Sequence, residues 1–226
     1  MLFKIEGTDV YLLASMHCLP KLVSHINQPI FQAYQQSNIC MFEDDTTNER
    51  HQPPNFRNGD GSLQPWAKAQ QIIGSIAVES GFEFGSGLDS FLFKKSIEDK
   101  KEIEFLDIED CRHAYSLAPI REQESMLSFA VNHREKVVDF LQGIYTAWRV
   151  WDVAALAEAL QGQFCLFPET YGRLVTVRNQ IWMPKILATI SAGSSALIVA
   201  GAFHFVGPEG LCLQTKNHGY NLLEIG

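Results

Sequence analysis

Two histidines near opposite ends of the chain each follow an apolar segment that is typical of a buried β-strand. In 10–17 and in 197–204, four apolar residues precede a small residue, two further residues and then the histidine, His17 or His204. Ligand sites in open α/β sheets form beyond the carboxyl ends of strands, so we expect both imidazoles at the rim of one pocket. Because imidazole suits Zn, Mn, Fe and Co, the pair could bind one metal ion or one substrate.

Glu43 is the natural third member of this site, because it closes the apolar strand 39–42 and should emerge at the same rim. A His/Glu/His set leaves positions open for water, as a catalytic metal site requires, and the ion would lower the pKa of that water to ~7. Two other interpretations stay open. Each histidine could be a loop residue bonded to backbone, and Asp44–Asp45 could be a solvated turn. The more specific HExxH motif is absent.

The predicted elements indicate how these side chains are positioned. Helical patterns occupy 21–36, 64–79, 88–100 and 169–191, and 118–160 contains two or three helices broken near Gly143 and Trp151–Asp152. Residues 46–61, rich in polar residues, proline and glycine, form the predicted mobile loop. Strands are predicted over 2–6, 9–15, 38–43, 102–108 and 196–200, with 210–214 and 220–225 as two others.

Strands at both ends and a helical middle, about 118–190, predict a single α/β domain over residues 1–226. Its core would be a mixed β-sheet flanked by helices. The two similar histidine segments look like one structural device used twice, each with a strand-end histidine.

The composition is that of an ordinary globular protein and disfavours several classes of partner. The formal charge is −8, with 18 basic against 26 acidic residues, which argues against nucleic acid and anionic membranes. Five cysteines without a CxxC pair are typical of buried free thiols in a reducing compartment. The first residues lack the pattern of a signal peptide, and no apolar run reaches ~18 residues. We therefore expect a cytoplasmic protein without a membrane span.

Several short blocks, in order along nearly the whole chain, resemble the TraB/GumN family, relatives of the Tiki metalloproteases. Residues 11–20 are similar to its first G-x-x-H block, and residues 199–211 with Gly219–Tyr220 are similar to its second. Its PW, G-[VL]-D-x-x-L, W-x-x-G-D-x-x-x-L and R-N-x-x-W/M segments resemble residues 65–66, 87–92, 148–156 and 178–182.

This chain departs from the family pattern at three places. Ala14 replaces the glycine of the first block, Trp151 replaces the glycine of the W-x-x-G-D stretch, and Leu106–Asp107 stands where L-E is usual. None of the three is a proposed ligand, but together they make a shared substrate preference uncertain.

The resemblance implies two related half-sheets that each carry a G-x-x-H histidine, with a strand-end glutamate and an arginine completing the site. The residues implied are the metal ligands His17, Glu43 and His204, the catalytic residues Glu43 and Arg178, and the substrate-binding residues Asn179 and Asp89.

Arg178 also has an independent physical case, because with Asn179 it interrupts an apolar segment. A guanidinium that faces the pocket could stabilise the oxyanion of an acyl-transfer intermediate or hold a substrate carboxylate. The alternative is an arginine on a helix surface in a salt bridge.

Four functions are compatible with these residues. The first is a metal-dependent, metalloprotease-like hydrolase of a peptide or another amide-bearing small molecule, with Mn or Co by analogy with Tiki proteins, or Zn. The second is a metal-independent hydrolase, similar to the erythromycin-esterase-like fold, in which a histidine or Glu43 is the general base. The third is a non-enzymatic protein that binds haem or a small ligand, as a haem-binding relative does. The fourth is a degenerate, regulatory member of the family.

Overall fold

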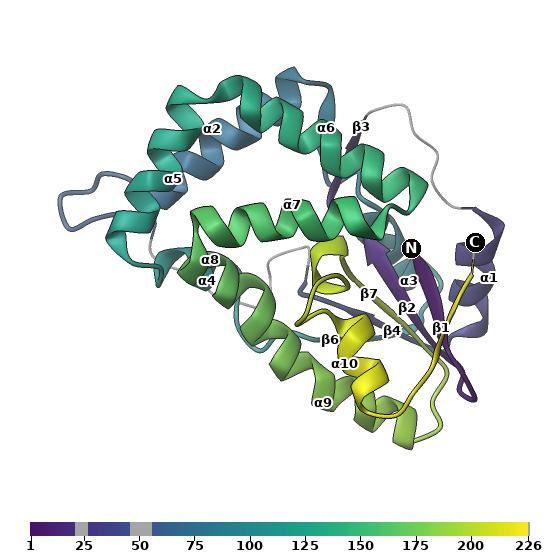
Figure 1. Cartoon of the computed structure of the whole chain (residues 1–226). Helices are drawn as coiled ribbons and strands as arrows, with labels where there is room; N and C mark the ends of the chain where they lie inside the picture. Colours follow the sequence, from purple (N-terminus) through teal and green to yellow (C-terminus); the bar gives the residue numbers. More distant parts are fainter. Residues whose placement is uncertain (21–26, 46–55, 226) are drawn as a thin grey trace.

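The strands are β1 (Leu2–Ile5), β2 (Val10–Ser15), β3 (Cys18–Pro20), β4 (Ile39–Phe42), β5 (Phe82–Phe84), β6 (Glu102–Phe105), β7 (Ala196–Gly201) and β8 (Leu222–Glu224). They belong to a computed structural model that describes residues 1–20, 27–45 and 56–225. Six strands form one mixed sheet in the order β6-β4-β7-β2-β1-β8, and β3 pairs with β5 in a small second sheet. The predicted α/β class, a mixed sheet flanked by helices, is confirmed (Figure 1).

Four neighbouring strands, β6, β4, β7 and β2, run parallel, so their carboxyl ends meet at one edge of the sheet. β7 comes late in the sequence and inserts between β2 and β4. Every residue of β2 and of β7 is buried, which explains their near-continuous apolar sequences. β1 pairs antiparallel with both β2 and β8 and makes the sheet mixed.

The two segments that carry the histidines lie side by side, but their register differs by one residue from their sequence similarity. The similarity aligns Ala14 with Gly201, whereas the sheet pairs Ser15 with Gly201. After β7 a single 3₁₀ turn, η2 (Ala202–His204), carries its histidine, whereas after β2 the chain continues into β3. The two imidazoles are therefore presented by different local structures.

The helices are α1 (Gln28–Gln36), α2 (Pro65–Glu79), α3 (Leu88–Glu98), α4 (Arg112–Ser116), α5 (Ile120–Asn132), α6 (Arg134–Val150), α7 (Val153–Leu166), α8 (Pro168–Tyr171), α9 (Arg178–Ser191) and α10 (Leu211–Asn217). Figure 1 shows α2, α5, α6 and α7 together beyond the carboxyl ends of the parallel strands, with α9 and α10 beside the sheet. In the ranges that the structure covers, no helix is long and apolar enough to cross a membrane.

The prediction of a strand over 210–214 is wrong, because Gly210 caps the first turn of α10. Leu211 and Thr215 are the buried residues of α10, and a separation of four residues places them on one helix face. The segment is too short for its apolar residues to distinguish a helix from a strand by periodicity alone.

The prediction of a helix break at Gly143 is also wrong, because this glycine lies inside α6. The chain leaves the helix instead at His133, between α5 and α6, where φ is −130° and ψ is 46°. The break predicted at Trp151–Asp152 is confirmed, and Asp152 caps α7 by accepting the N–H of Ala155. Of the predicted first helix and mobile loop, residues 21–26 and 46–55 lie outside the described residues.

The last helical segment before β7 contains a π-helical turn. α8, the π-helix η1 (Gly172–Val177) and α9 follow one another without a gap. The buried carboxylate of Glu122 accepts the N–H groups of Glu169 (3.1 Å) and Thr170 (3.0 Å) and so caps the first turn of this run. π-Helical turns are rare in proteins, and those that occur are often found at functional sites. This one ends directly before Arg178.

Trp151 has a left-handed backbone conformation, with φ 65° and ψ 28°, at the carboxyl end of α6. Only glycine adopts this conformation without steric cost, which explains why the family pattern has glycine at this position. In this chain the tryptophan ring packs against the main hydrophobic core, and this packing offsets the backbone strain.

We expect the free energy of unfolding of Trp151→Gly to exceed that of Trp151→Ala by about 1 kcal/mol, so the glycine variant is the more stable of the two. Both variants lose the ring, so the difference isolates the cost of the left-handed backbone. Urea unfolding of the two variants measures it. An alanine variant at least as stable as the glycine variant would show that this residue is not left-handed in solution.

Candidate functional site

The carboxyl ends of the parallel strands bring together polar side chains that are far apart in sequence. Glu43 follows β4 directly, Asp107 follows β6 by two residues, and His17 and His204 follow β2 and β7. Glu43 Oε1 lies 3.5 Å from Nε2 of His17, and Glu43 Oε2 lies 3.9 Å from Nε2 of His204. The structure thus places His17 and His204 beside the carboxylate of Glu43, the third predicted ligand.

Asp89 fixes the orientation of His17. The Nδ1 atom of His17 lies 2.9 Å from Oδ2 of Asp89, which belongs to the first turn of α3. Asp89 is itself held by Ser15, whose hydroxyl donates to Oδ1 (2.9 Å) and accepts the Asp89 N–H (3.1 Å). This anchoring turns Nε2 of His17 towards Glu43. The His17 side chain is 57% exposed, so water reaches it.

Asn179 fixes His204 in an equivalent way. The Asn179 Nδ2 donates to the backbone carbonyls of His204 (3.0 Å) and Glu209 (2.8 Å), so its Oδ1 must be the acceptor that lies 2.7 Å from Nδ1 of His204. His204 Nδ1 therefore carries the proton and Nε2 presents a lone pair. Burial lowers the pKa of His204 to about 3, so the ring is neutral.

His204 does not lie at the rim where the sequence places it. Only 5% of the residue is exposed, and its ring packs 4.3 Å from the indole of Trp182 on α9. The 3₁₀ turn after β7 turns the side chain inward, and a one-residue difference in register between two strands is not visible in the sequence. His17 is therefore the accessible histidine and His204 the buried one.

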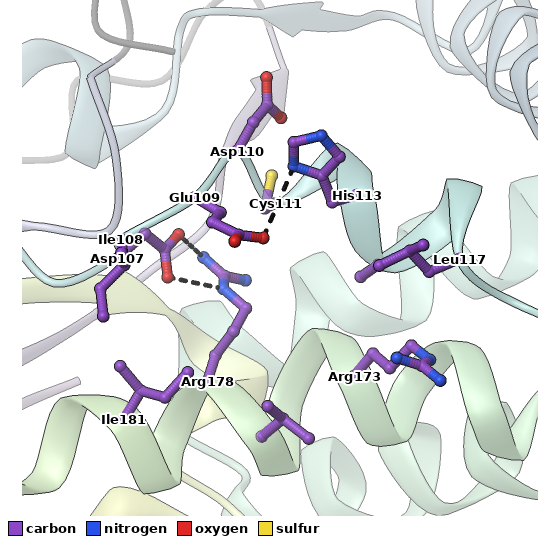
Figure 2. A pocket seen from close by; sticks show the side chains of 12 residues that line it. Asp107, Ile108, Glu109, Asp110, Cys111, His113, Leu117, Arg173, Arg178 and Ile181 are labelled. Carbon is purple, nitrogen blue, oxygen red and sulfur yellow. Dashed lines mark hydrogen bonds and ion pairs between the residues drawn. The ribbon is translucent and has the colours of Figure 1, made fainter. Parts of the chain in front are cut away.

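Arg178 is the common partner of the other site residues. Its Nε and Nη2 donate to the two carboxylate oxygens of Asp107 (3.0 and 2.7 Å), and Nη2 also donates to Glu43. Its Nη1 donates to the backbone carbonyl of Leu174 (3.1 Å) and lies 3.2 Å from Nε2 of His204. The Arg178 side chain is thus only 12% exposed, and Figure 2 shows it directed at Asp107 and not at solvent.

Two carboxylates, the partly buried Glu43 and the buried Asp107, share this guanidinium. Burial raises the pKa of Glu43, but Arg178 and the N–H of Gly201 outweigh burial and hold that pKa well below its usual value. Burial also raises the pKa of Asp107, and there Arg178 offsets it only in part. Burial opposes the charge on Arg178, yet the two carboxylates together raise the pKa of the guanidinium. Removing one member would leave an uncompensated buried charge.

The pKa of His17 is raised for the same kind of reason. Burial lowers this pKa, but the carboxylates of Asp89 and Glu43 outweigh it. Since the side chain is half exposed, solvent screens part of this field.

Two glycines allow the close approach of backbone and side chains here. A Cβ on Gly201 would lie 2.8 Å from Nε2 of His17 and 3.2 Å from Oε1 of Glu43. A Cβ on Gly87 would lie 2.4 Å from Oδ1 of Asp89. The glycine of the second G-x-x-H block and the glycine of the G-L-D segment therefore leave space for the site itself.

The site opens onto two cavities that meet at Arg178. One, of about 360 Å³, is lined by His17, Glu43, Asp89 and Arg178, and by Asp44 and Asp45 behind Glu43. The other, of about 290 Å³, lies between α4 and the helix of Arg178, with Ile108, Leu117 and Ile181 on its walls (Figure 2). Arg178 lines both, so a bound molecule in either cavity would reach its guanidinium.

His17, Glu43 and His204 are of residue types that bind divalent metal ions, but their spacing and hydrogen bonds suit an ion less well. Ligands of one tetrahedral ion at ~2.1 Å lie ~3.4 Å apart, which matches the 3.5 Å between His17 Nε2 and Glu43 Oε1. His204 Nε2, however, is hydrogen-bonded by Arg178. Across the described ranges, no group of three or more His, Cys, Asp or Glu side chains is arranged to hold a metal ion.

The fold and site define an α/β protein in which a glutamate, two histidines and a buried arginine meet at the carboxyl ends of parallel strands. A model of the TraB/PrgY/gumN family matches residues 49–222, most of the chain, and the chain belongs to this family. The match includes Asp89, Arg178, Asn179 and His204, and it begins after Glu43. No curated protein and no solved structure matches the chain.

Sequence reasoning missed two residues that the site depends on. Asp107 holds Arg178 through both carboxylate oxygens, and Trp182 Nε1 donates to Asp107 (2.7 Å). A signal for Asp107 existed, because it lies just beyond the end of a predicted strand, as Glu43 does. Trp182 lies in a helical apolar pattern, and its role follows only from the tertiary structure. Asn179 and Asp89, predicted to bind substrate, both contact the histidines, and their contact with substrate stays a prediction.

We expect Trp182→Phe to lower the free energy of unfolding more than Trp148→Phe does. Trp182 donates to a charged acceptor, and a hydrogen bond to a charged group contributes about 1.5–3 kcal/mol. Trp148 donates to the neutral carbonyl of Ala14, for which about 0.5–1.5 kcal/mol is typical. Urea denaturation of both variants measures the difference, and equal losses would argue that Asp107 is not ionised.

Proposed function

We propose that the chain is a hydrolase of peptide or other amide bonds, with its water-activating centre at His17, Glu43 and His204. The observation that carries the proposal is the anchoring of both imidazoles through Nδ1, His17 by Asp89 and His204 by Asn179. This leaves the two Nε2 atoms directed at the Glu43 carboxylate. Histidines that ligate catalytic metals, and histidines that act as general bases, are oriented by such partners.

We further propose that a divalent ion, Mn, Co or Zn, binds at this centre. His17 and Glu43 would hold it first, because their donor atoms already have suitable spacing. His204 would be the third donor once it gives up its hydrogen bond with Arg178. A bound ion of this kind supplies hydroxide at neutral pH and polarises a substrate carbonyl.

Arg178 would stabilise negative charge on the substrate. Its guanidinium is held by Asp107 and lines both cavities, so it is positioned before substrate binds. A preorganised donor beside a reacting carbonyl lowers the barrier by stabilising the oxyanion as it develops. Asp89 and Asn179 would contribute by holding the imidazoles, and Asp44 and Asp45 lie where they would contact a substrate in the larger cavity.

A metal-free hydrolase is the second candidate, and the contact between Arg178 and His204 favours it. In this alternative one imidazole or Glu43 removes a proton from water directly, and Arg178 keeps the same role. The two candidates differ in one property that is simple to measure, the dependence of activity on a metal ion.

Equilibrium dialysis against Mn²⁺ tests the metal without an assay of activity. We expect the untagged chain to bind one ion, Glu43→Gln to lose it, and Glu104→Gln to keep it. Glu104 is an exposed glutamate on β6, so its variant controls for the loss of one negative charge. Equal binding by both variants would exclude Glu43 as a ligand.

Treatment with a chelator separates the two hydrolases. With a mixed library of fluorogenic peptides as substrate, we expect the chelated protein to lose activity and to regain it with Mn²⁺ or Co²⁺. Full activity after chelation, with loss in Glu43→Gln, would support the metal-free candidate. Absence of activity in both states over a broad set of amides and esters would contradict the proposed function.

We expect Arg178→Lys to lower kcat about 10²-fold or more, because lysine keeps the charge but not the bidentate geometry. Arg121→Lys, on the exposed face of α5, is the matched control and should retain full activity. Circular dichroism of both variants checks that the fold is kept. An unchanged kcat in a folded Arg178→Lys would remove Arg178 from the mechanism.

A further inference from the structure

A separate cavity of about 230 Å³ lies within the helical layer of the molecule. α2, α4, α5, α6, α7 and α8, which Figure 1 shows around this region, all contribute to its walls. It shares no lining residue with the two cavities that meet at Arg178. Most of its wall is apolar or aromatic, formed by Ile73, Met126, Phe129, Val137, Phe140, Leu141 and Phe167.

Several polar side chains on this wall lack suitable partners. The hydroxyls of Tyr115 and Tyr171, the amide of Gln163 and the ammonium of Lys136 make no hydrogen bond or ion pair within the described part of the chain. Gln70 reaches only the sulfur of Met126, at 3.7 Å, which is a weak acceptor. Lys136 is exposed and the other three residues are partly exposed, so water can bond these groups and a ligand in the cavity can replace that water.

The polar side chains on the wall determine which ligand the cavity suits. Each of the four can donate a hydrogen bond, and Lys136 is a cation, so they are complementary to an anionic oxygen acceptor. The remaining wall is complementary to hydrocarbon. The volume is below the ~300–1,000 Å³ of pockets for drug-sized ligands, so the partner is small.

We propose that this cavity binds a carboxylic acid with a hydrocarbon body, such as a medium-chain fatty acid. The carboxylate bonds Lys136 and the tyrosine hydroxyls, and the chain lies among Phe129, Phe140 and Phe167. This proposal does not depend on the proposed hydrolytic function, because the two sites have no residue in common.

Isothermal titration with octanoate and with 1-octanol tests the proposal. The two probes have the same chain length and differ in the head group, so we expect octanoate to bind saturably, one per chain, and octanol to bind at least tenfold more weakly. Lys136→Ala should weaken octanoate binding about tenfold, and Tyr171→Phe should weaken it several-fold. Lys94→Ala, an exposed lysine on α3, is the control for loss of one cation and should not change the affinity.

A second set of variants places the ligand within the molecule. Val137→Phe adds a ring to the cavity wall and should abolish octanoate binding, whereas Glu43→Gln should bind as the parent does. Lys136 is exposed, so its replacement by alanine should leave the fold intact. The Lys136→Ala result therefore tests the proposal even if Val137→Phe does not fold.

Three results would overturn the proposal. They are absence of saturable binding to the parent, equal affinity for octanol and octanoate, and loss of binding in Glu43→Gln. The last result would place the carboxylate in the site of His17.

Discussion

The candidate site depends on one largely buried cation that two carboxylates share. Arg178 joins the ends of β4 and β6 to the start of α9, because it bonds Glu43 and Asp107 at the same time. The desolvation of such a group is costly, and only well-placed partners offset that cost. Trp182 provides part of this placement by bonding the same carboxylate that holds the arginine. The π-helical turn before α9 sets the rotation at which the guanidinium leaves the helix.

The two histidines resemble each other in sequence and differ in environment. His17 is accessible and lies between two carboxylates, whereas His204 is buried, neutral and bonded to an arginine. Their common feature is that each ring is fixed through Nδ1 by a residue from a different helix. Such anchoring determines which nitrogen faces Glu43, and it explains why an aspartate in α3 and an asparagine in α9 belong to the candidate site.

Much of the fold and of the candidate site follows from the sequence. The strands that Glu43 and His17 follow can be read from the sequence, because burial on both faces makes parallel strands nearly continuous apolar runs. The burial of His204 does not follow, since it results from a 3₁₀ turn and a one-residue difference in register. The helix at Leu211 is missed because periodicity does not distinguish a helix of seven residues from a short strand. Asp107 is missed because its significance lies in its partner, Arg178, which is far away in sequence.

The position of β7 in the sheet has a consequence for the biogenesis of the protein. The whole helical middle of the chain separates β7 from β2 and β4, so during synthesis these two strands lack their shared neighbour until that segment has left the ribosome. Until then each of these two strands exposes an unpaired edge, which is a template for association with other chains. A nascent or carboxyl-terminally shortened polypeptide would thus have neither a closed sheet nor an assembled centre, and it would need protection from aggregation.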